Sequence, residues 1–164
     1  MQIGIVTLFP EIFNVLTEYG ISSKAMQKRV ISLECWNPRS YTVDARRTVD
    51  DKPFGGGPGM LMKTEPLVNA IQAAKAGVRQ ESQNGEMLEA KVVYLSPQGK
   101  PLKQSNVVEL SKRSNMVLVC GRYQGIDTRI IDSEIDEEWS LGDFVISGGE
   151  LAAMTLIDAM IRVQ

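Results

Sequence analysis

Hydrophobic positions along the chain form several short, continuous runs. Residues 2–9 are apolar and rich in β-branched side chains up to Pro10, and residues 91–95 and 115–120 form similar runs. Strands that are apolar on both faces are typical of a parallel sheet with helices on both sides. The pattern therefore predicts three strands of one such sheet.

Other segments show the three- to four-residue spacing of apolar positions that is typical of helices. We expect helices at residues 11–19, 65–76, 102–112 and 151–161. Strands that alternate with helices of this size predict a single α/β domain with a mainly parallel sheet and helices on both faces. The polar segment 77–89 is interpreted as a mobile loop.

Composition supports one soluble domain and narrows its chemistry. The chain has 164 residues, of which 43% are hydrophobic and 23% charged, enough to bury a continuous core. No apolar run approaches the roughly 20 residues that span a bilayer, and no signal peptide opens the chain, so we expect a cytoplasmic protein without a membrane partner. Cys35 and Cys120 match no metal-ligand spacing and are interpreted as free thiols.

The sequence contains no histidine, which excludes histidine-based acid–base catalysis, Ser-His triads and the common zinc sites. A net charge of −2 argues against a domain that wraps nucleic acid by charge alone. Basic residues do gather in two stretches, 24–29 and 39–47, which could contact phosphates or form an ordinary basic surface. The acidic run 132–138 is interpreted as the flank of a helix or interface rather than a metal site.

Glycine-rich segments are the main candidates for ligand binding. Four glycines within residues 55–59 allow positive φ angles and a close approach of a ligand, although a flexible surface turn is an equal alternative. Three further loops, 94–99, 120–127 and 140–150, follow predicted strands. Ligands of open α/β sheets bind at the carboxyl ends of strands, and exposed backbone groups there can recognise the edge of an adenine. Each loop taken alone could equally be a tight turn.

Several long motifs resemble one family, and they occur in order over nearly the whole chain. They are Leu8-Phe9-Pro10-Glu11, Arg47-Thr48-Val49-Asp50-Asp51, Gly55-Gly56-Gly57-Pro58-Gly59-Met60, Tyr94-Leu95-Ser96-Pro97-Gln98-Gly99, Gly121-Arg122-Tyr123, Asp136-Glu137-Glu138-Trp139-Ser140 and Gly142-Asp143-Phe144-Val145-Ile146-Ser147-Gly148-Gly149-Glu150-Leu151. Together they resemble the bacterial tRNA (guanine-N1)-methyltransferases.

The resemblance implies a SPOUT-class fold with a deep trefoil knot in its C-terminal part and a homodimer whose sites lie at the subunit interface. Nothing in the periodicity indicates a knot, which connection rules disfavour. The implied reaction is methyl transfer from S-adenosylmethionine to N1 of the guanosine immediately 3′ of the anticodon in tRNA. Residues 1–162 would form the cofactor-binding catalytic domain, and the family's linker, which carries a general-base aspartate, and its C-terminal tRNA-binding domain would lie beyond Gln164.

The resemblance also assigns residues to roles. It implies that Arg162 is catalytic, because a guanidinium can stabilise the negative charge that forms on guanine O6. No metal ligand is assigned. The residues near the target guanosine would be Asp50, Gly55, Gly56, Gly57, Pro58 and Gly59. The cofactor pocket would be formed by Tyr94, Leu95, Ser96, Pro97, Gly121, Tyr123, Leu141, Gly142, Asp143, Phe144, Val145, Ile146, Gly148 and Gly149.

One departure from the family pattern bears on metal use. Gln124 stands where the family usually has glutamate, which puts magnesium dependence in doubt.

The chain ends at residues 162–164 directly after an apolar helix without a cap, which indicates truncation, with a native end as the alternative. The apolar segment 151–161 has no obvious cover, which favours a homodimer.

Two other functions remain as alternatives. A non-catalytic RNA-binding or dimerisation module on the same fold would bind no S-adenosylmethionine. A dinucleotide-dependent oxidoreductase is disfavoured because no Gly-x-Gly-x-x-Gly follows the first strand.

Overall fold

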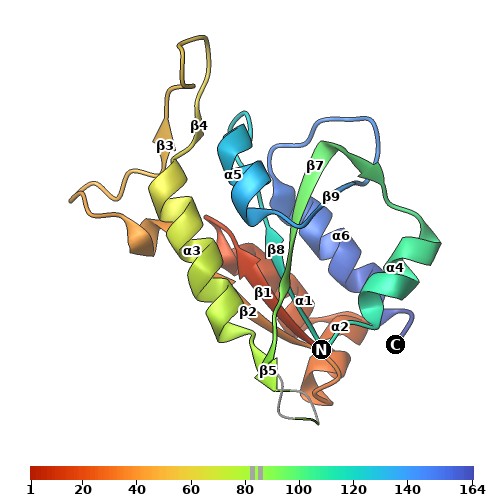
Figure 1. Ribbon diagram of the computed structural model, residues 1–164. Helices are drawn as coiled ribbons and strands as arrows, with labels where there is room; N and C mark the ends of the chain where they lie inside the picture. The colour runs from red at the N-terminus through yellow and green to blue at the C-terminus, as the bar shows by residue number, and fades with distance from the viewer. Residues whose placement is uncertain (82–83, 85–86) are drawn as a thin grey trace.

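The computed structural model describes residues 1–81, 84 and 87–164, and its centre is a five-stranded sheet in the order β2-β1-β8-β7-β9 (Figure 1). All neighbouring strands of this sheet pair in parallel. The predicted α/β class with a mainly parallel sheet is therefore confirmed. The strands are β1 (Gln2–Val6), β2 (Ser32–Trp36), β7 (Lys91–Pro101), β8 (Asn115–Val119) and β9 (Glu137–Ser140).

Helices cover both faces of the sheet, as predicted (Figure 1). One face packs against α3 (Thr64–Gly77) and α5 (Thr128–Glu134). The other face packs against α1 (Asn14–Glu18), α2 (Gly20–Gln27), α4 (Gln104–Ser111) and α6 (Gly149–Ile161). Short elements complete the described chain: the 3-10 helices η1 (Pro10–Phe13) and η2 (Pro38–Tyr41), and two hairpins, β3 (Asp50–Asp51) with β4 (Leu61–Met62) and β5 (Gln80–Glu81) with β6 (Met87–Leu88).

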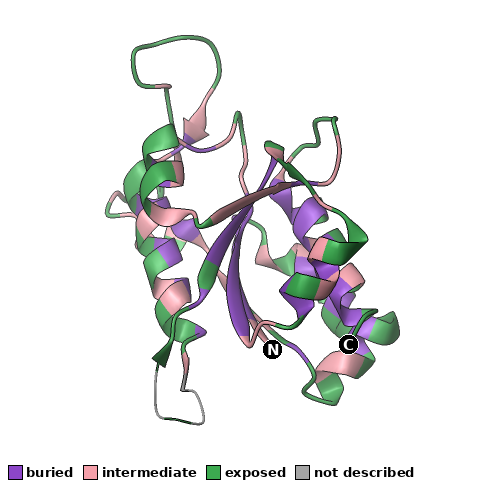
Figure 2. Ribbon diagram, turned by 45° about the vertical axis from the view of Figure 1, so that its right-hand side comes forward, coloured by how far each residue is buried: buried purple, intermediate pink, exposed green. Residues whose placement is uncertain are grey.

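The central strand β8 shows why continuous apolar runs predicted a covered sheet. Met116 and Leu118 pack in the cluster beneath α6, whereas Val117 and Val119 pack in the cluster beneath α3. Consecutive side chains of a strand face opposite sides, so both faces must be apolar when helices cover both. All five residues of β8 are buried, and Figure 2 shows buried positions along the centre of the sheet.

The elements that the pattern did not predict are mostly short or partly exposed. The strands β2 and β9 lie at the two edges of the sheet, and most of their residues are not fully buried. Edge strands need no continuous apolar run, so the periodicity contained no signal for them. The helices α2 and α5 were also missed; they have eight and seven residues.

Three expectations need correction. The helix expected at 11–19 is η1 followed by α1, because Pro10 starts a 3-10 turn and Tyr19 is extended. The loop expected at 77–89 is partly a hairpin, since β5 and β6 pair; residues 82, 83, 85 and 86 lie outside the described residues. The apolar segment 151–161 is mostly covered within the chain, because six of its residues are buried.

The cysteines, the helix lengths and the knot bear on the remaining expectations. Cys35 and Cys120 are both free thiols, as predicted. No helix among the described residues is long and apolar enough to cross a membrane. The trefoil knot stays a prediction.

Candidate functional site

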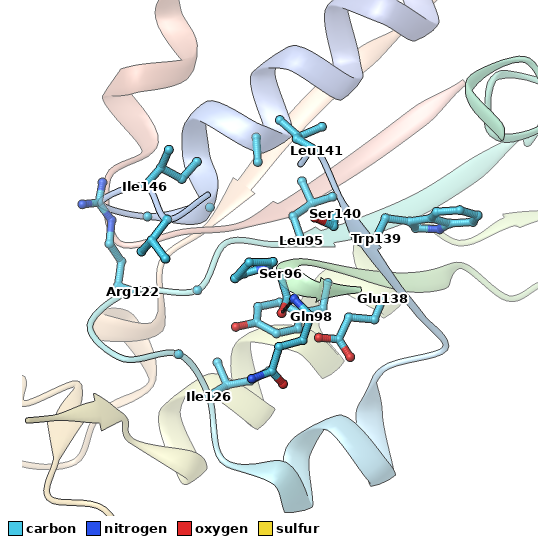
Figure 3. A pocket seen from close by; sticks show the side chains of 18 of the residues that line it. Leu95, Ser96, Gln98, Arg122, Ile126, Glu138, Trp139, Ser140, Leu141 and Ile146 are labelled. Atoms are coloured by element: carbon cyan, nitrogen blue, oxygen red, sulfur yellow. Dashed lines mark hydrogen bonds between the residues drawn. The ribbon is translucent and has the colours of Figure 1, made fainter. Parts of the chain in front are cut away.

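A cavity of about 400 Å³ lies at the carboxyl ends of β8 and β9 and beside the middle of β7 (Figure 3). Its lining residues come from three segments of the chain: 94–98, 121–131 and 138–152. These segments include the three that the sequence singled out, and the parallel sheet brings them together because their strands point the same way. The loop expected at 94–99 needs correction: these residues belong to β7, which continues to Pro101 and pairs with β9 on both sides of an irregularity between Leu95 and Lys100. The volume falls within the range typical of small-molecule sites.

Thirteen of the fourteen residues predicted to bind a cofactor line this one cavity, and their role in binding stays a prediction. Asp143, the fourteenth, does not line it. The thirteen are Tyr94, Leu95, Ser96, Pro97, Gly121, Tyr123, Leu141, Gly142, Phe144, Val145, Ile146, Gly148 and Gly149.

Several glycines of the cavity wall have no space for a side chain, and Gly121 and Gly149 are two of them. A Cβ atom on Gly121 would lie 2.8 Å from Oη of Tyr94, and one on Gly149 would lie 2.8 Å from Cα of Cys120. Neither glycine has the positive φ angle that favours glycine over other residues. The backbone of these loops therefore lies directly against neighbouring groups, with no room for a side chain.

A buried ion pair holds the walls of the cavity together. Nε of Arg122 lies 2.8 Å from Oε2 of Glu150, although the contact is not a well-aligned hydrogen bond. Thr7 donates a hydrogen bond to Oε1 of Glu150 (2.9 Å), and Nη1 of Arg122 donates to the carbonyl oxygen of Ser147 (3.2 Å). The Arg122 guanidinium also stacks 4.4 Å above the ring of Phe9. The segments after β1, β8 and β9 are thereby fixed relative to one another.

Sequence reasoning missed several residues of the cavity. Arg122 and Glu138 lie within motifs that were quoted for the resemblance, but neither was assigned a role. Glu138 belongs to an acidic run, which is usually a solvated surface. Only the parallel pairing of β9 with β7 brings it opposite Tyr94 and into the cavity. Burial, followed by the negative charge of Glu138, raises the pKa of Tyr94 to about 12.

Three other residues of the acidic run make structural contacts. Asp136 accepts a hydrogen bond from Lys91 (2.8 Å), and Glu137 pairs with Arg113 (2.6 Å). Glu134 accepts a hydrogen bond from Gln72. In the part of the chain that the structure describes, no group of three or more cysteine or acidic residues is placed to hold a metal ion.

The glycine-rich segment joins β3 to β4 and projects from the body of the domain (Figure 1). Its four glycines all have positive φ angles, as their spacing predicted. Asp50 begins this hairpin and, like the segment 55–59, does not line the cavity. The base of the hairpin nevertheless contacts the cavity wall: Gln124 N–H donates to the carbonyl oxygen of Met60 (3.0 Å), and Gly59 packs against the Gln124 side chain.

The hairpin is also attached to α5. Asp127 caps this helix, accepting a hydrogen bond from the backbone N–H of Arg129 (2.9 Å) and pairing with its guanidinium (2.8 Å). Hydrogen bonds from Arg129 lower the pKa of Asp127 to about 2. The same guanidinium lies 5.1 Å from the ring centre of Phe54, next to the glycines.

Arg162 lies far from the cavity of its own chain. Gly149 begins α6 and lines the cavity, whereas Arg162 follows the last residue of the helix and is exposed. A helix of this length spans about 20 Å. The predicted catalytic arginine therefore does not reach the cavity that its own chain forms.

Comparisons with known proteins agree with this arrangement. The family model of tRNA (Guanine-1)-methyltransferase TrmD matches residues 1–164. A tRNA (guanine-N(1)-)-methyltransferase from Haemophilus ducreyi is 55% identical over 99% of this chain, and one from Edwardsiella ictaluri is 57% identical over 99%. The chain spans 63% and 61% of the lengths of these two relatives.

A solved structure has the same fold. The tRNA (m1G37) methyltransferase from Aquifex aeolicus superposes with a TM-score of 0.83 at 36% sequence identity. The match covers 99% of this chain and 69% of that one. On the extent of the family match and the identity to its curated members, the chain belongs to the tRNA (guanine-1)-methyltransferase family.

Proposed function

We propose that the cavity binds S-adenosylmethionine and that the protein transfers its methyl group to N1 of a guanosine in tRNA, the one immediately 3′ of the anticodon. Membership of the family supports the reaction. The observation that carries the cofactor assignment is that thirteen predicted residues from three separate segments of the chain surround one cavity. We also propose that the protein works in the cytoplasm.

The walls of the cavity suit this cofactor. Leu95, Leu141 and Ile146 offer apolar surface for an adenine ring, and the glycine-rich loops expose backbone groups that can hydrogen bond to its edge. Gln98, Gln124 and Glu138 offer polar groups for the amino-acid part. When bound, S-adenosylmethionine supplies an activated methyl group, and the residues of this chain bind and orient it.

The glycine-rich hairpin is proposed to receive the target guanosine. It adjoins the cavity through Gln124, and its glycines at positions 55, 56 and 57 have no other atoms within 4 Å of where a side chain would begin. A flat base can therefore approach this backbone closely. Pro58 and Gly59 complete the hairpin, and Asp50 lies at its start.

We propose a homodimer because Arg162 cannot serve its own cavity. An arginine that stabilises charge on guanine O6 must touch the base, and a second copy of the chain could bring its Arg162 to this cavity. Exposed apolar side chains on α1, α2 and α6 offer a surface for such a contact.

Residues 1–162 form the cofactor-binding domain in this proposal. The remaining length of the relatives would carry the family's general base and its tRNA-binding domain. Residues 1–164 should therefore suffice to bind S-adenosylmethionine, whereas methyl transfer should be about 10²- to 10⁴-fold faster when the segment with the general base is present.

Calorimetric titration of the 164-residue chain with S-adenosylmethionine tests the first step. Saturable binding with one site per chain is expected, and its absence would favour the non-catalytic RNA-binding or dimerisation module. A radiolabelled methyl-transfer assay tests the second step, using unmodified tRNA and, as control, tRNA with adenosine in place of the guanosine 3′ of the anticodon. Label should appear only with guanosine and increase when the chain is extended by the remaining length of its relatives.

A further inference from the structure

The cavity contains one carboxylate with an oxygen that the protein leaves unpaired. Glu138 lies in β9 opposite Tyr94 of β7, and its side chain lies beside Gln98 at one end of the cavity (Figure 3). Oε1 of Glu138 is buried, yet it accepts no hydrogen bond from the residues that the structure describes. A buried acceptor without a donor costs free energy, so this position favours a ligand that donates a hydrogen bond.

The preceding residue shows that this arrangement is specific to Glu138. Glu137 accepts a hydrogen bond from Arg113 (2.6 Å) and another from Nε1 of Trp139 (3.0 Å). Consecutive side chains of a strand point to opposite sides. Glu137 therefore stabilises the fold, while Glu138 is left facing the cavity.

The charges that line the cavity do not balance. Among the described residues that line it, Glu138 is the one acidic side chain and Arg122 the one basic side chain. The charge of Arg122 is already compensated by Glu150 at 2.8 Å. A net negative charge therefore remains at the end of the cavity where Glu138 lies, which attracts a cationic group.

The polarity of the walls orients the ligand. Leu141 and Ile146 lie on the opposite side of the cavity from Gln98 and Glu138 (Figure 3). An adenine ring fits the apolar side, so the amino-acid part of the ligand is directed toward Glu138. We propose that the carboxylate of Glu138 is a further cofactor-binding residue, which accepts a hydrogen bond from the α-ammonium group of S-adenosylmethionine. This inference rests on the proposed function.

Calorimetry tests the assignment by comparing the affinities of the unchanged chain and of Glu138→Gln for three ligands. S-adenosylmethionine has both a sulfonium and an α-ammonium group, S-adenosylhomocysteine has only the α-ammonium, and 5′-methylthioadenosine has neither. Glu138→Gln should weaken binding of the first two by at least about 10-fold each, as expected for a hydrogen bond between charged groups. Affinity for 5′-methylthioadenosine should change less than about twofold, because adenine and ribose are bound elsewhere.

The matched control is Glu137→Gln, which should lower the melting temperature and leave all three affinities unchanged. Unchanged affinities in Glu138→Gln would overturn the inference. Weaker binding of S-adenosylmethionine alone would overturn it as well, because the sulfonium would then lie beside Glu138. An equal loss for 5′-methylthioadenosine would place the ribose beside Glu138 and would also overturn it. If the unchanged chain bound none of the ligands, the proposed function would fail as well. Glu138→Ser gives the same comparison should Glu138→Gln not fold.

Discussion

The guanidinium of Arg122 and the carboxylate of Glu150 form an ion pair, 2.8 Å between Nε and Oε2, behind the wall of the cavity. The Glu150 side chain is 1% exposed, so this charge has almost no contact with water. It lies in the first turn of α6, where a negative charge is favoured by the helix dipole. The pair joins the loop after β8 to the start of α6, and Thr7 extends the contact to the end of β1.

The first prediction concerns this pair. Glu150→Ala should lower the free energy of unfolding by about 3–5 kcal/mol, because it leaves the mostly buried charge of Arg122 without a partner. Urea denaturation measures the loss. As a control, Lys91→Met removes a largely exposed partner of Asp136 and should lower the free energy of unfolding much less. Equal losses in the two variants would show that the burial of Glu150 has no special effect.

The second prediction concerns space in the cavity wall. Gly121→Ala should weaken S-adenosylmethionine binding severely, because its Cβ would lie 2.8 Å from Oη and 2.9 Å from Cε2 of Tyr94 and must displace that ring. Gly121→Val should abolish binding. Calorimetry measures affinity, and circular dichroism checks the fold. Val43→Ala, an exposed change outside the segments that line the cavity, is the control and should bind normally. Normal binding by a folded Gly121→Val would remove this loop from the site.

Much of this fold could be predicted from the sequence because its central strands are covered on both sides. Such strands need apolar residues at every position, as β8 shows, and the run is therefore visible without a structure. The edge strand β9 has the sequence Glu137-Glu-Trp-Ser140 and gives no such signal. Its position depends on pairing with β7, a contact between segments far apart in the chain that no local pattern encodes.

Some features of the candidate site could also be predicted from the sequence, and others could not. Glycines after strands indicated where loops converge, and the positive φ angles of the hairpin glycines followed from their number. The Arg122–Glu150 contact was not predictable, because it joins two loops whose separation depends on the whole sheet. The catalytic role of Arg162 was assigned by resemblance alone. The length of α6 shows that this residue is remote from the cavity of its own chain.

The third prediction concerns pH. Hydrogen bonds from Arg129 lower the pKa of Asp127 to about 2, below the value near 4 expected for an unfolded aspartate. The folded state is therefore stabilised at pH values above 4, and this contribution is lost as the pH falls from 4 to 2. Asp127→Ala also removes the cap of α5 and should cost about 1 kcal/mol at pH 7.

Thermal unfolding from pH 7 to pH 2.5 measures this difference. The gap in melting temperature between the unchanged chain and Asp127→Ala should narrow below pH 4. The exposed Asp132 of the same helix provides the control, since Asp132→Ala should change the melting temperature little at any pH. A gap that stayed constant to pH 2.5 would mean that the carboxylate charge of Asp127 does not stabilise α5.

The last prediction is that the chain forms a homodimer through α1, α2 and α6. Tyr19 and Ile21, at the junction of α1 and α2, are 66% and 51% exposed, and Leu151 of α6 is 54% exposed. These helices pack on the same face of the sheet, so their exposed side chains can form one apolar surface that a second copy would cover. Sedimentation equilibrium at micromolar concentration should give twice the chain mass. The double variant Tyr19→Glu with Leu151→Glu should give the mass of one chain, because charges buried in an interface are costly.

Val43 is 91% exposed and lies outside these helices, so Val43→Glu should leave the dimer intact. A monomeric unchanged chain would refute the prediction, and it would leave Arg162, at the far end of α6, without a cavity on which to act.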